Sequence, residues 1–311
     1  MLNLEYLKNL NEKQKEAVLY LEGPLLIVAG AGSGKTKVLI SRIANIIEKK
    51  KAYPNQILAV TFTNKAAKEM QERISKILKK EAIGLSWLGT FHSVCAKLLR
   101  KHAKAVNLNS NFTIIDQDDQ IKLIKNISKA ENIDSKKISP KYILAIIDKW
   151  KNKGWYPEDV VLKKKEVLEK GFLNIYKIYQ SKLIDLNACD FSDLILHCVK
   201  IFEKYPDITE MYSKNFKYIL VDEYQDTNLI QSKWLNYLTK YNQNICCVGD
   251  DDQSIYSWRG AEIKNFLEFD KIYKDTKIVR LERNYRSTQN ILSVASKIIS
   301  NNESRVGKNL Y

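Results

Sequence analysis

The chain has 311 residues, a length that predicts about two compact domains or one domain with a large insertion. Hydrophobic residues make up 45% of the sequence and charged residues 28%, which favours a packed globular protein over a disordered or fibrous one. Lysine and arginine number 51 against 36 aspartate and glutamate residues. The formal net charge of +15 favours a polyanionic partner such as nucleic acid, although a compositional bias of the genome would give the same excess.

The cysteines and the apolar runs argue against several other classes of protein. Five cysteines are present, an odd number with no C-x-x-C pair, so the sequence indicates neither a disulfide framework nor a zinc knuckle and favours a reducing compartment. Residues 1–14 lack the apolar core of a signal peptide, and no run approaches the ~18 apolar residues of a membrane span. We expect a soluble protein of the cytoplasm with no membrane partner.

Short β-rich runs alternate with amphipathic helical stretches over the first third of the chain. Buried strands are predicted at 25–28, 57–62 and 87–90, and helices at 64–78 and 91–104. Strands that alternate with helices in this way are typical of a parallel sheet covered by helices. The sequence therefore predicts an α/β fold.

The pattern changes from about residue 109 to residue 187, where helical stretches are joined by lysine-rich connectors. The α/β pattern resumes with strands at 217–221 and 245–248. A strand at 277–281 resembles the start of a further domain, which too few residues remain to complete. We therefore expect a first α/β domain at 1–108 and 188–276, an inserted helical domain at 109–187, and the truncated start of a second α/β domain at 277–311.

A glycine-rich loop follows the first predicted strand and precedes a helix. Its residues are Ala29, Gly30, Ala31, Gly32, Ser33, Gly34, Lys35 and Thr36, the pattern of a phosphate-binding loop with alanine in place of the first glycine. The glycines let backbone N–H groups and the helix N-terminus hold a phosphate. In such a loop Lys35 reaches the β- and γ-phosphate oxygens of ATP, and the Thr36 hydroxyl binds Mg²⁺. The sequence thus predicts a site for ATP and Mg²⁺.

An acidic pair follows a later strand. The apolar run 218–221 leads into Asp222 and Glu223. Alone, such a pair is more often a solvated turn, but together with a phosphate-binding loop it stands where a carboxylate orients the metal. We expect Asp222 to hold Mg²⁺ through its water shell and Glu223 to act as general base on the attacking water.

The next strand is followed by a polar turn and then by aromatic residues. Gln253 in this turn carries an amide suited to contact both the γ-phosphate and the catalytic water. Tyr256, Trp258 and Arg259 come shortly after it. Rings interleaved with a basic residue favour stacking of unpaired bases and contact with the nucleic-acid backbone, although either ring alone would more often belong to a core.

Further candidates lie at strand-to-helix corners and near the end of the chain. Phe62, Asn64 and His92 combine rings and hydrogen-bonding groups that suit base stacking and phosphate contact, although each alone is more often structural. Tyr285 is suited to cover an adenine, and Arg286 is suited to act as an arginine finger.

Taken in order, seven segments resemble the motifs of the UvrD/Rep/PcrA family of superfamily 1 helicases. They are residues 10–14 (Q motif), 29–36 (motif I), 59–70 (motif Ia), 89–93 (motif Ib), 221–228 (motif II), 248–261 (motif III) and 281–287 (motif IV). The resemblance implies that Gln14 reads the adenine and that Phe62, Asn64 and His92 contact the DNA strand. Residues 189–193 are similar to the segment where family members re-enter the first motor domain.

The resemblance also implies RecA-like motor domains, ATP-driven 3′ to 5′ movement on single-stranded DNA, and duplex unwinding in repair or replication restart. The expected partners are single-stranded DNA, duplex junctions and repair or replication proteins, in the bacterial cytosol or nucleoid. Catalysis in this architecture needs charge stabilisation from across an interdomain cleft. We therefore expect this polypeptide alone to be a monomer that binds ATP weakly and unwinds little DNA.

The sequence leaves three other functions open. A nucleic-acid-binding module without motor activity is disfavoured because Lys35, Asp222, Glu223 and Gln253 are all present. A small-molecule kinase or other phosphate-loop enzyme would leave the tandem aromatic residues and the basic charge unexplained. The helicase part of a nuclease-helicase would carry its nuclease beyond Tyr311.

Overall fold

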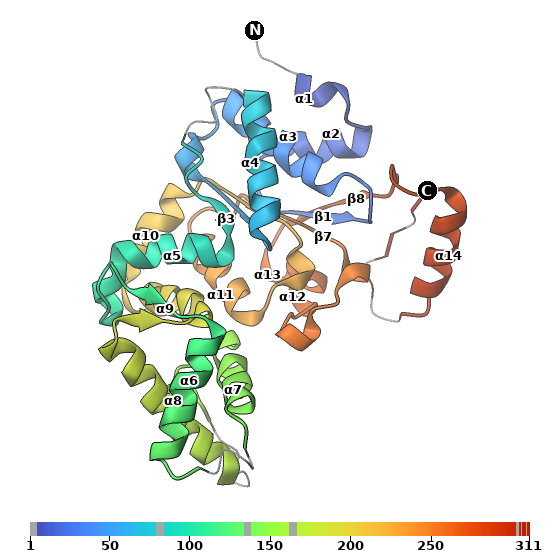
Figure 1. The fold of residues 1–311 in the computed structure, drawn as a ribbon. Coiled ribbons are helices and arrows are strands. Elements are labelled where there is room, and N and C mark those ends of the chain that lie inside the picture. The colour runs from blue at the N-terminus through green and yellow to red at the C-terminus, as the bar shows by residue number, and fades with distance from the viewer. Residues whose placement is uncertain are drawn as a thin grey trace. The chain divides into compact units, whose positions relative to one another are not determined.

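The computed structural model describes residues 5–78, 84–133, 138–161, 167–302, 305, 307–308 and 310–311. The chain divides into two compact units, which Figure 1 shows as a ribbon. The first unit comprises Met1–Val94, Glu210–Thr227 and Leu235–Tyr311, and the second comprises Cys95–Thr209 and Asn228–Trp234. Each unit contains its own cluster of buried apolar side chains.

A sheet of six parallel strands is the centre of the first unit. The strands are β1 (Leu25–Ala29), β2 (Ile57–Thr61), β3 (Leu88–Thr90), β6 (Tyr218–Val221), β7 (Ile245–Gly249) and β8 (Lys277–Leu281). Their order in the sheet is β3-β2-β6-β7-β1-β8. The four inner strands are buried throughout, as expected for a parallel sheet covered on both faces, whereas the edge strands β3 and β8 are partly exposed.

The two long helices of the first unit each follow a strand. α3 (Lys35–Glu48) follows β1 and is buried over most of its length. α4 (Asn64–Leu78) follows β2, and its buried side chains recur every three to four residues, at Ala67, Met70, Ile74 and Leu78. The remaining helices wholly within this unit are α1 (Glu5–Lys8), α2 (Glu12–Leu19), α12 (Lys264–Leu267), α13 (Phe269–Ile272) and α14 (Gln289–Ile299).

The second unit is mainly helical. Its core lies between α6 (Gln117–Ala130), α7 (Pro140–Asn152) and α8 (Val167–Asp185), and the short strands β4 (Thr113–Ile114) and β5 (Ala188–Cys189) pair in parallel. α9 (Phe191–Lys204) belongs to the same unit. Three helices cross the boundary between the units, namely α5 (Phe91–His102), α10 (Pro206–Asn215) and α11 (Leu229–Leu238).

Side-chain capping fixes where two helices of the second unit begin. The Asp116 carboxylate accepts a hydrogen bond from the backbone N–H of Asp119 and so caps α6. Ser139 caps α7 in the same way, and Pro140 occupies the first helical position, where its missing N–H costs nothing. Both starting points are therefore set by local sequence.

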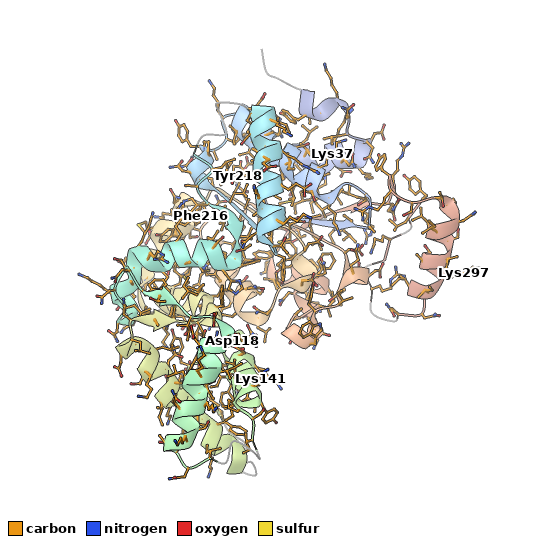
Figure 2. All side chains as sticks on the ribbon, in the orientation of Figure 1. Lys37, Asp118, Lys141, Phe216, Tyr218 and Lys297 are labelled. Carbon is orange, nitrogen blue, oxygen red and sulfur yellow. The ribbon has the colours of Figure 1, made fainter. Side chains whose placement is uncertain are left out.

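An aromatic cluster anchors the start of β6. The ring of Phe216 meets the ring of Trp87 edge-on, with 5.3 Å between centroids, and stacks with Tyr212 at 5.9 Å. Figure 2 labels Phe216 and Tyr218 at this point of the chain. Because the start of β6 is fixed in this way, its carboxyl end delivers the following acidic residues to a defined place at the sheet edge.

The α/β fold class expected from the sequence is confirmed, and each predicted strand forms within two residues of its expected bounds. The strand β8 has a different role from the expected one. It pairs in parallel with β1 over Leu25 to Ala29 and thus completes the same sheet, instead of opening a separate one. Only Val279 and Leu281 of this strand are buried, and this alternation is the pattern of an edge strand.

Candidate active site

The phosphate loop connects the carboxyl end of β1 to the start of α3. Gly32 and Gly34 have φ angles of 70° and 89°, values that favour glycine, and Gly34 is the N-cap of the helix. The Ser33 hydroxyl donates to the Gly30 carbonyl oxygen at 2.7 Å and closes the turn. No acidic side chain lies in the first turn of α3, and no side chain caps it. The positive end of a 14-residue helix is therefore available to an anion.

Lys35 and the acidic pair lie together at this edge of the sheet. Nζ of Lys35 is 3.4 Å from Oε2 of Glu223, so the ends of α3 and β6 converge. Asp222 is buried, and burial together with the neighbouring Glu223 raises the pKa of Asp222 to about 7. Glu223 has φ of 50°, a left-handed backbone conformation that is unusual for a side-chain-bearing residue. Strain of this kind concentrates at functional sites.

Gln253 is connected to the acidic pair through two residues that the sequence did not single out. The Gln225 side chain donates through Nε2 to Oε2 of Glu223 at 2.9 Å, and its Oε1 accepts the backbone N–H of Asp250 at 3.0 Å. The Asp250 carboxylate accepts a hydrogen bond from Nε2 of Gln253. Gln225 and Asp250 lie in the polar segments that follow the two neighbouring buried strands β6 and β7, and this position was the available signal for them.

The donor set fits a nucleotide phosphate with a divalent cation. The Thr36 hydroxyl and the Asp222 carboxylate are oxygen ligands of the kind that Mg²⁺ prefers. The raised pKa of Asp222 reflects a buried carboxylate next to a second one, and a cation beside this pair would favour its ionised form. Ala29, Gly30 and Ala31 complete the backbone of the loop.

Residues from both ends of the chain meet on the phosphate loop. Nε2 of Gln14 donates to the Ser33 carbonyl oxygen at 2.9 Å, and the Tyr285 backbone N–H donates to the Gly32 carbonyl oxygen at 3.0 Å. Gln14 and Tyr285 thus both lie against the phosphate loop, and their contact with the adenine stays a prediction. A Cβ on Gly32 would stand 2.6 Å from Cβ of Arg286, so Arg286 also lies directly beside the loop.

A row of aromatic rings follows the same edge of the sheet. The rings of Phe62 and Tyr256 are stacked, with centroids 6.5 Å apart and planes 10° apart, and the Trp258 ring lies 6.4 Å from Tyr256. Trp258 is 73% exposed. Phe62 follows β2 whereas the other two rings follow β7, so residues far apart in sequence form one surface.

The structure does not bring every predicted DNA contact into this row. Asn64 is exposed at the start of α4. His92 is half-buried at the start of α5, and burial lowers its pKa below the usual value. The side chain of Arg259 lies outside the described residues.

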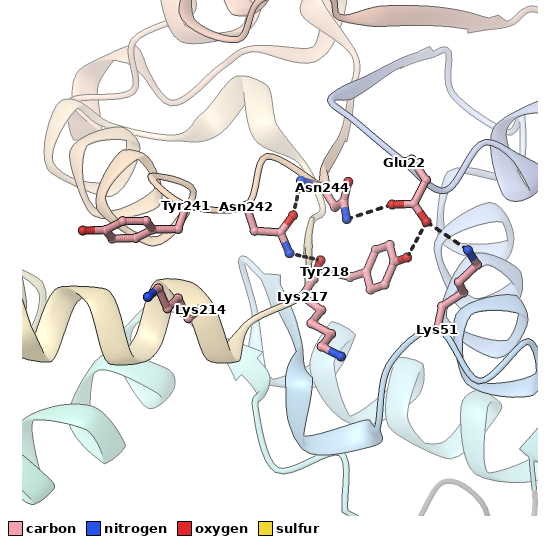
Figure 3. Close-up of a pocket in the computed structure, with 8 residues that line it drawn as sticks. All are labelled: Glu22, Lys51, Lys214, Lys217, Tyr218, Tyr241, Asn242 and Asn244. Atoms are coloured by element: carbon pink, nitrogen blue, oxygen red, sulfur yellow. Dashed lines mark hydrogen bonds and ion pairs between the residues drawn. The ribbon is translucent and has the colours of Figure 1, made fainter.

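A separate polar pocket lies at the amino ends of the strands β6 and β7, and Figure 3 shows it in close-up. Its volume is about 400 Å³. Tyr218 at the start of β6 contributes its hydroxyl, which donates to Glu22 at 3.1 Å, and Lys51 pairs with the same carboxylate. The phosphate loop follows the carboxyl end of β1, so this pocket is not the candidate nucleotide site.

Comparison with known proteins decides the family. The family model described as the UvrD/REP helicase N-terminal domain matches residues 10–274. The chain belongs to this family. The UvrD/REP match covers the phosphate loop, the acidic pair and the aromatic row.

Individual relatives agree with this assignment. The chain is 49% identical to a probable DNA helicase II homologue of Rickettsia conorii, over 100% of this chain and 48% of the relative. It is 49% identical to DNA helicase II of Rickettsia typhi, over 100% of this chain and 47% of the relative. It is 47% identical to the ATP-dependent DNA helicase PcrA of Staphylococcus epidermidis, over 98% of this chain and 42% of the relative. The chain thus spans a little under half the length of these relatives.

Among the residues that the structure describes, no helix is both long enough and apolar enough to cross a membrane.

Proposed function

We propose that this chain is the ATP-binding part of a DNA helicase, which couples ATP hydrolysis to movement on single-stranded DNA and to duplex unwinding. The observation that carries the proposal is a series of contacts from Lys35 through Glu223, Gln225 and Asp250 to Gln253. Gln253 lies on the turn that leads into Tyr256 and Trp258. One short segment thus joins the nucleotide site to the aromatic row. The names of the relatives support the same activity.

Each residue of the site has a role in this proposal. The phosphate loop and Lys35 bind the phosphates of ATP, while Thr36 and Asp222 hold Mg²⁺, which supplies charge neutralisation at the phosphates when bound. Glu223 accepts a proton from the attacking water, and Gln253 orients that water. Gln14 and Tyr285 bind the adenine, and Arg286 supplies positive charge beside the transferred phosphate.

The aromatic row would bind the DNA strand. Exposed rings stack on bases irrespective of sequence, and a net charge of +15 favours the phosphate backbone. From the resemblance of the motifs to the UvrD/Rep/PcrA family we also propose 3′ to 5′ polarity, a role in repair or replication restart, and a bacterial cytosolic location. Duplex junctions and repair or replication proteins would be the partners.

The test is ATP hydrolysis by the natural full-length protein, measured with and without single-stranded DNA. We expect strong stimulation by DNA, and we expect Lys35→Ala to abolish it because the phosphates lose their cation. DNA binding that continues without any hydrolysis would favour the module without motor activity. A steep decrease of DNA affinity with salt would exclude a small-molecule kinase.

A further inference from the structure

A lysine near the end of the chain pairs through its almost fully covered side chain with three consecutive carboxylates. Nζ of Lys308 lies 2.5 Å from Oδ1 of Asp250, 3.1 Å from Oδ1 of Asp251 and 2.6 Å from Oδ2 of Asp252. Only 2% of the Lys308 side chain is exposed. Arg305 adds a bidentate pair to Asp252, at 2.6 and 2.7 Å. The turn that carries Gln253 is therefore held by cations from another part of the chain.

Hydrogen bonds of the residues on either side of Lys308 hold this part of the chain independently of these ion pairs. Nε of Arg280 in β8 donates to the Gly307 carbonyl oxygen at 3.0 Å. The Tyr311 backbone N–H donates to the Glu282 carbonyl oxygen at 3.1 Å, and its carbonyl oxygen accepts the Asn284 N–H at 2.8 Å. Lys308 is thus held beside the strand β8 and beside Asn284, which precedes the residue that contacts the phosphate loop, Tyr285.

The three carboxylates need a cation. One oxygen from each of Asp250, Asp251 and Asp252 lies within 4.8 Å of the others, so their negative charges repel in a partly buried turn. Burial by itself lowers the pKa of Lys308, but the carboxylates outweigh this effect, and the pKa is raised above its usual value. Lys308 is therefore the charged partner that this turn requires.

Asp250 is hydrogen-bonded to Gln253 directly and to Glu223 through Gln225. The Asp250 carboxylate, which Lys308 contacts, also accepts the amide of Gln253. The backbone N–H of Asp250 donates to Gln225, which in turn donates to Glu223. A displacement of Asp250 would consequently move both the sensor amide and the general base.

We infer that Lys308 is a positioning residue for ATP hydrolysis: its ammonium group neutralises Asp250, Asp251 and Asp252 and thereby holds Gln253 and Glu223 in their working arrangement. The inference rests on the proposed function for its catalytic consequence. It also makes Lys308 a part of the hydrolytic site, although this residue lies far from Gln253 in the sequence.

Replacement of the lysine tests the inference in the natural full-length protein. We expect Lys308→Met to lower kcat for ATP by about 10- to 100-fold, because small displacements of catalytic groups have effects of this size. KM should change less than about threefold, since the phosphate loop is untouched. Lys308→Arg keeps the positive charge and should retain more activity than Lys308→Met. Lys297→Met, on the exposed side of α14, is the matched control and should behave as the wild type.

A second variant separates charge from packing. If repulsion among the carboxylates causes the loss of kcat in Lys308→Met, the addition of Asp251→Asn to this variant should recover a large part of kcat. Lys308→Met alone should bind Mn²⁺ at the freed carboxylates without nucleotide, as measured by electron paramagnetic resonance, and its amides at 250–253 should exchange hydrogen faster.

The experiments distinguish a failure of the positioning role of Lys308 from a failure of the proposed function. An unchanged kcat in Lys308→Met, or a loss that Asp251→Asn does not relieve, would overturn the positioning role. A wild-type protein that hydrolyses no ATP would instead contradict the proposed function. In that case Mn²⁺ binding and hydrogen exchange still decide whether Lys308 holds the turn, and unchanged values of both would reject the inference.

Discussion

Asn11 donates a hydrogen bond through Nδ2 to the phenolic oxygen of Tyr285 at 2.9 Å, across 274 positions of the chain. Asn11 is also the N-cap of α2, where its carboxamide oxygen accepts the backbone N–H of Gln14. One asparagine thus fixes both residues assigned to the adenine. The segment before the first strand and the segment after the last are joined beside the phosphate loop.

Substitution at Tyr285 should separate the hydrogen bond from the ring. Tyr285→Phe removes only the bond to Asn11, worth about 0.5–1.5 kcal/mol, so ATP affinity should fall by about 2- to 10-fold. Tyr285→Ala also removes the stacking face and should weaken binding by about a further 10-fold. Titration with a fluorescent ATP analogue measures both. Equal losses in the two variants would show that the ring does not contact the base.

Glu223→Gln should separate hydrolysis from binding. The carboxamide keeps the size of the side chain but cannot accept a proton from water, and general-base catalysis is worth about 10²- to 10⁴-fold. We expect kcat to fall by about this factor, with ATP affinity retained because the phosphate loop is unchanged. Single-turnover hydrolysis and equilibrium binding are the two measurements. A comparable loss of affinity would mean that the Lys35–Glu223 pair organises binding instead.

The strands and the phosphate loop could be predicted from the sequence because their signals are local. The apolar run before Asp222 and the glycines before Lys35 each identify an element within a few residues. The pairing of β8 with β1 and the contact of Lys308 with Asp250 could not be predicted in this way. Both join segments far apart in the chain, and charge pairing between such segments leaves no periodic pattern.

The second unit contains a buried ion cluster, and the stability that is lost when its cation is removed should depend on pH. Nζ of Lys151 lies 2.6 Å from Asp190 and 2.7 Å from Asp193, and all three side chains are buried. Lys151→Met leaves the two carboxylates without a cation and should destabilise the fold by about 3–5 kcal/mol near neutral pH. The exposed Lys149 on the same helix provides the control, Lys149→Met, which should have little effect.

The sign of the pH dependence follows from the carboxylates. Burial and the charge of Asp193 already raise the pKa of Asp190 to about 6, and the pKa should rise further without Lys151. A carboxyl group with a raised pKa in the folded state contributes stability at low pH and loses it as the pH rises through that pKa. Urea unfolding should therefore show a larger loss for Lys151→Met at pH 8 than at pH 5. A loss that is the same at both pH values would contradict this account.

Nearby groups do not reverse that expectation. Burial lowers the pKa of His197, which acts in the opposite direction, and burial raises the pKa of Asp148. The charge of Lys151 lowers the pKa of both groups, so both pKa values should be higher in Lys151→Met. A higher pKa of Asp148 adds to the loss of stability at pH 8, and a higher pKa of His197 reduces the loss at pH 5, so both effects have the expected sign.

Trp258 offers the most direct test of the aromatic row as a DNA-binding surface. Its ring is 73% exposed and is not part of either core cluster, so Trp258→Ala should leave stability nearly unchanged. Stacking on a base is worth about 1–3 kcal/mol, so single-strand affinity should fall by about 10- to 100-fold. Tyr53→Ala is the matched control, because this ring is 74% exposed but precedes β2 at the opposite edge of the sheet.

The salt dependence of the same titration tells stacking from charge. Removal of an uncharged ring releases no additional counterions, so the slope of log affinity against log salt should be the same for Trp258→Ala and the wild type. Fluorescence anisotropy of a labelled oligonucleotide at several salt concentrations measures both the affinity and the slope. If Trp258→Ala and Tyr53→Ala weaken binding equally, the row of Phe62, Tyr256 and Trp258 is not the DNA contact. If the slope changes as well, the substitution has displaced basic residues around the ring, and the stacking account would have to be replaced by an electrostatic one.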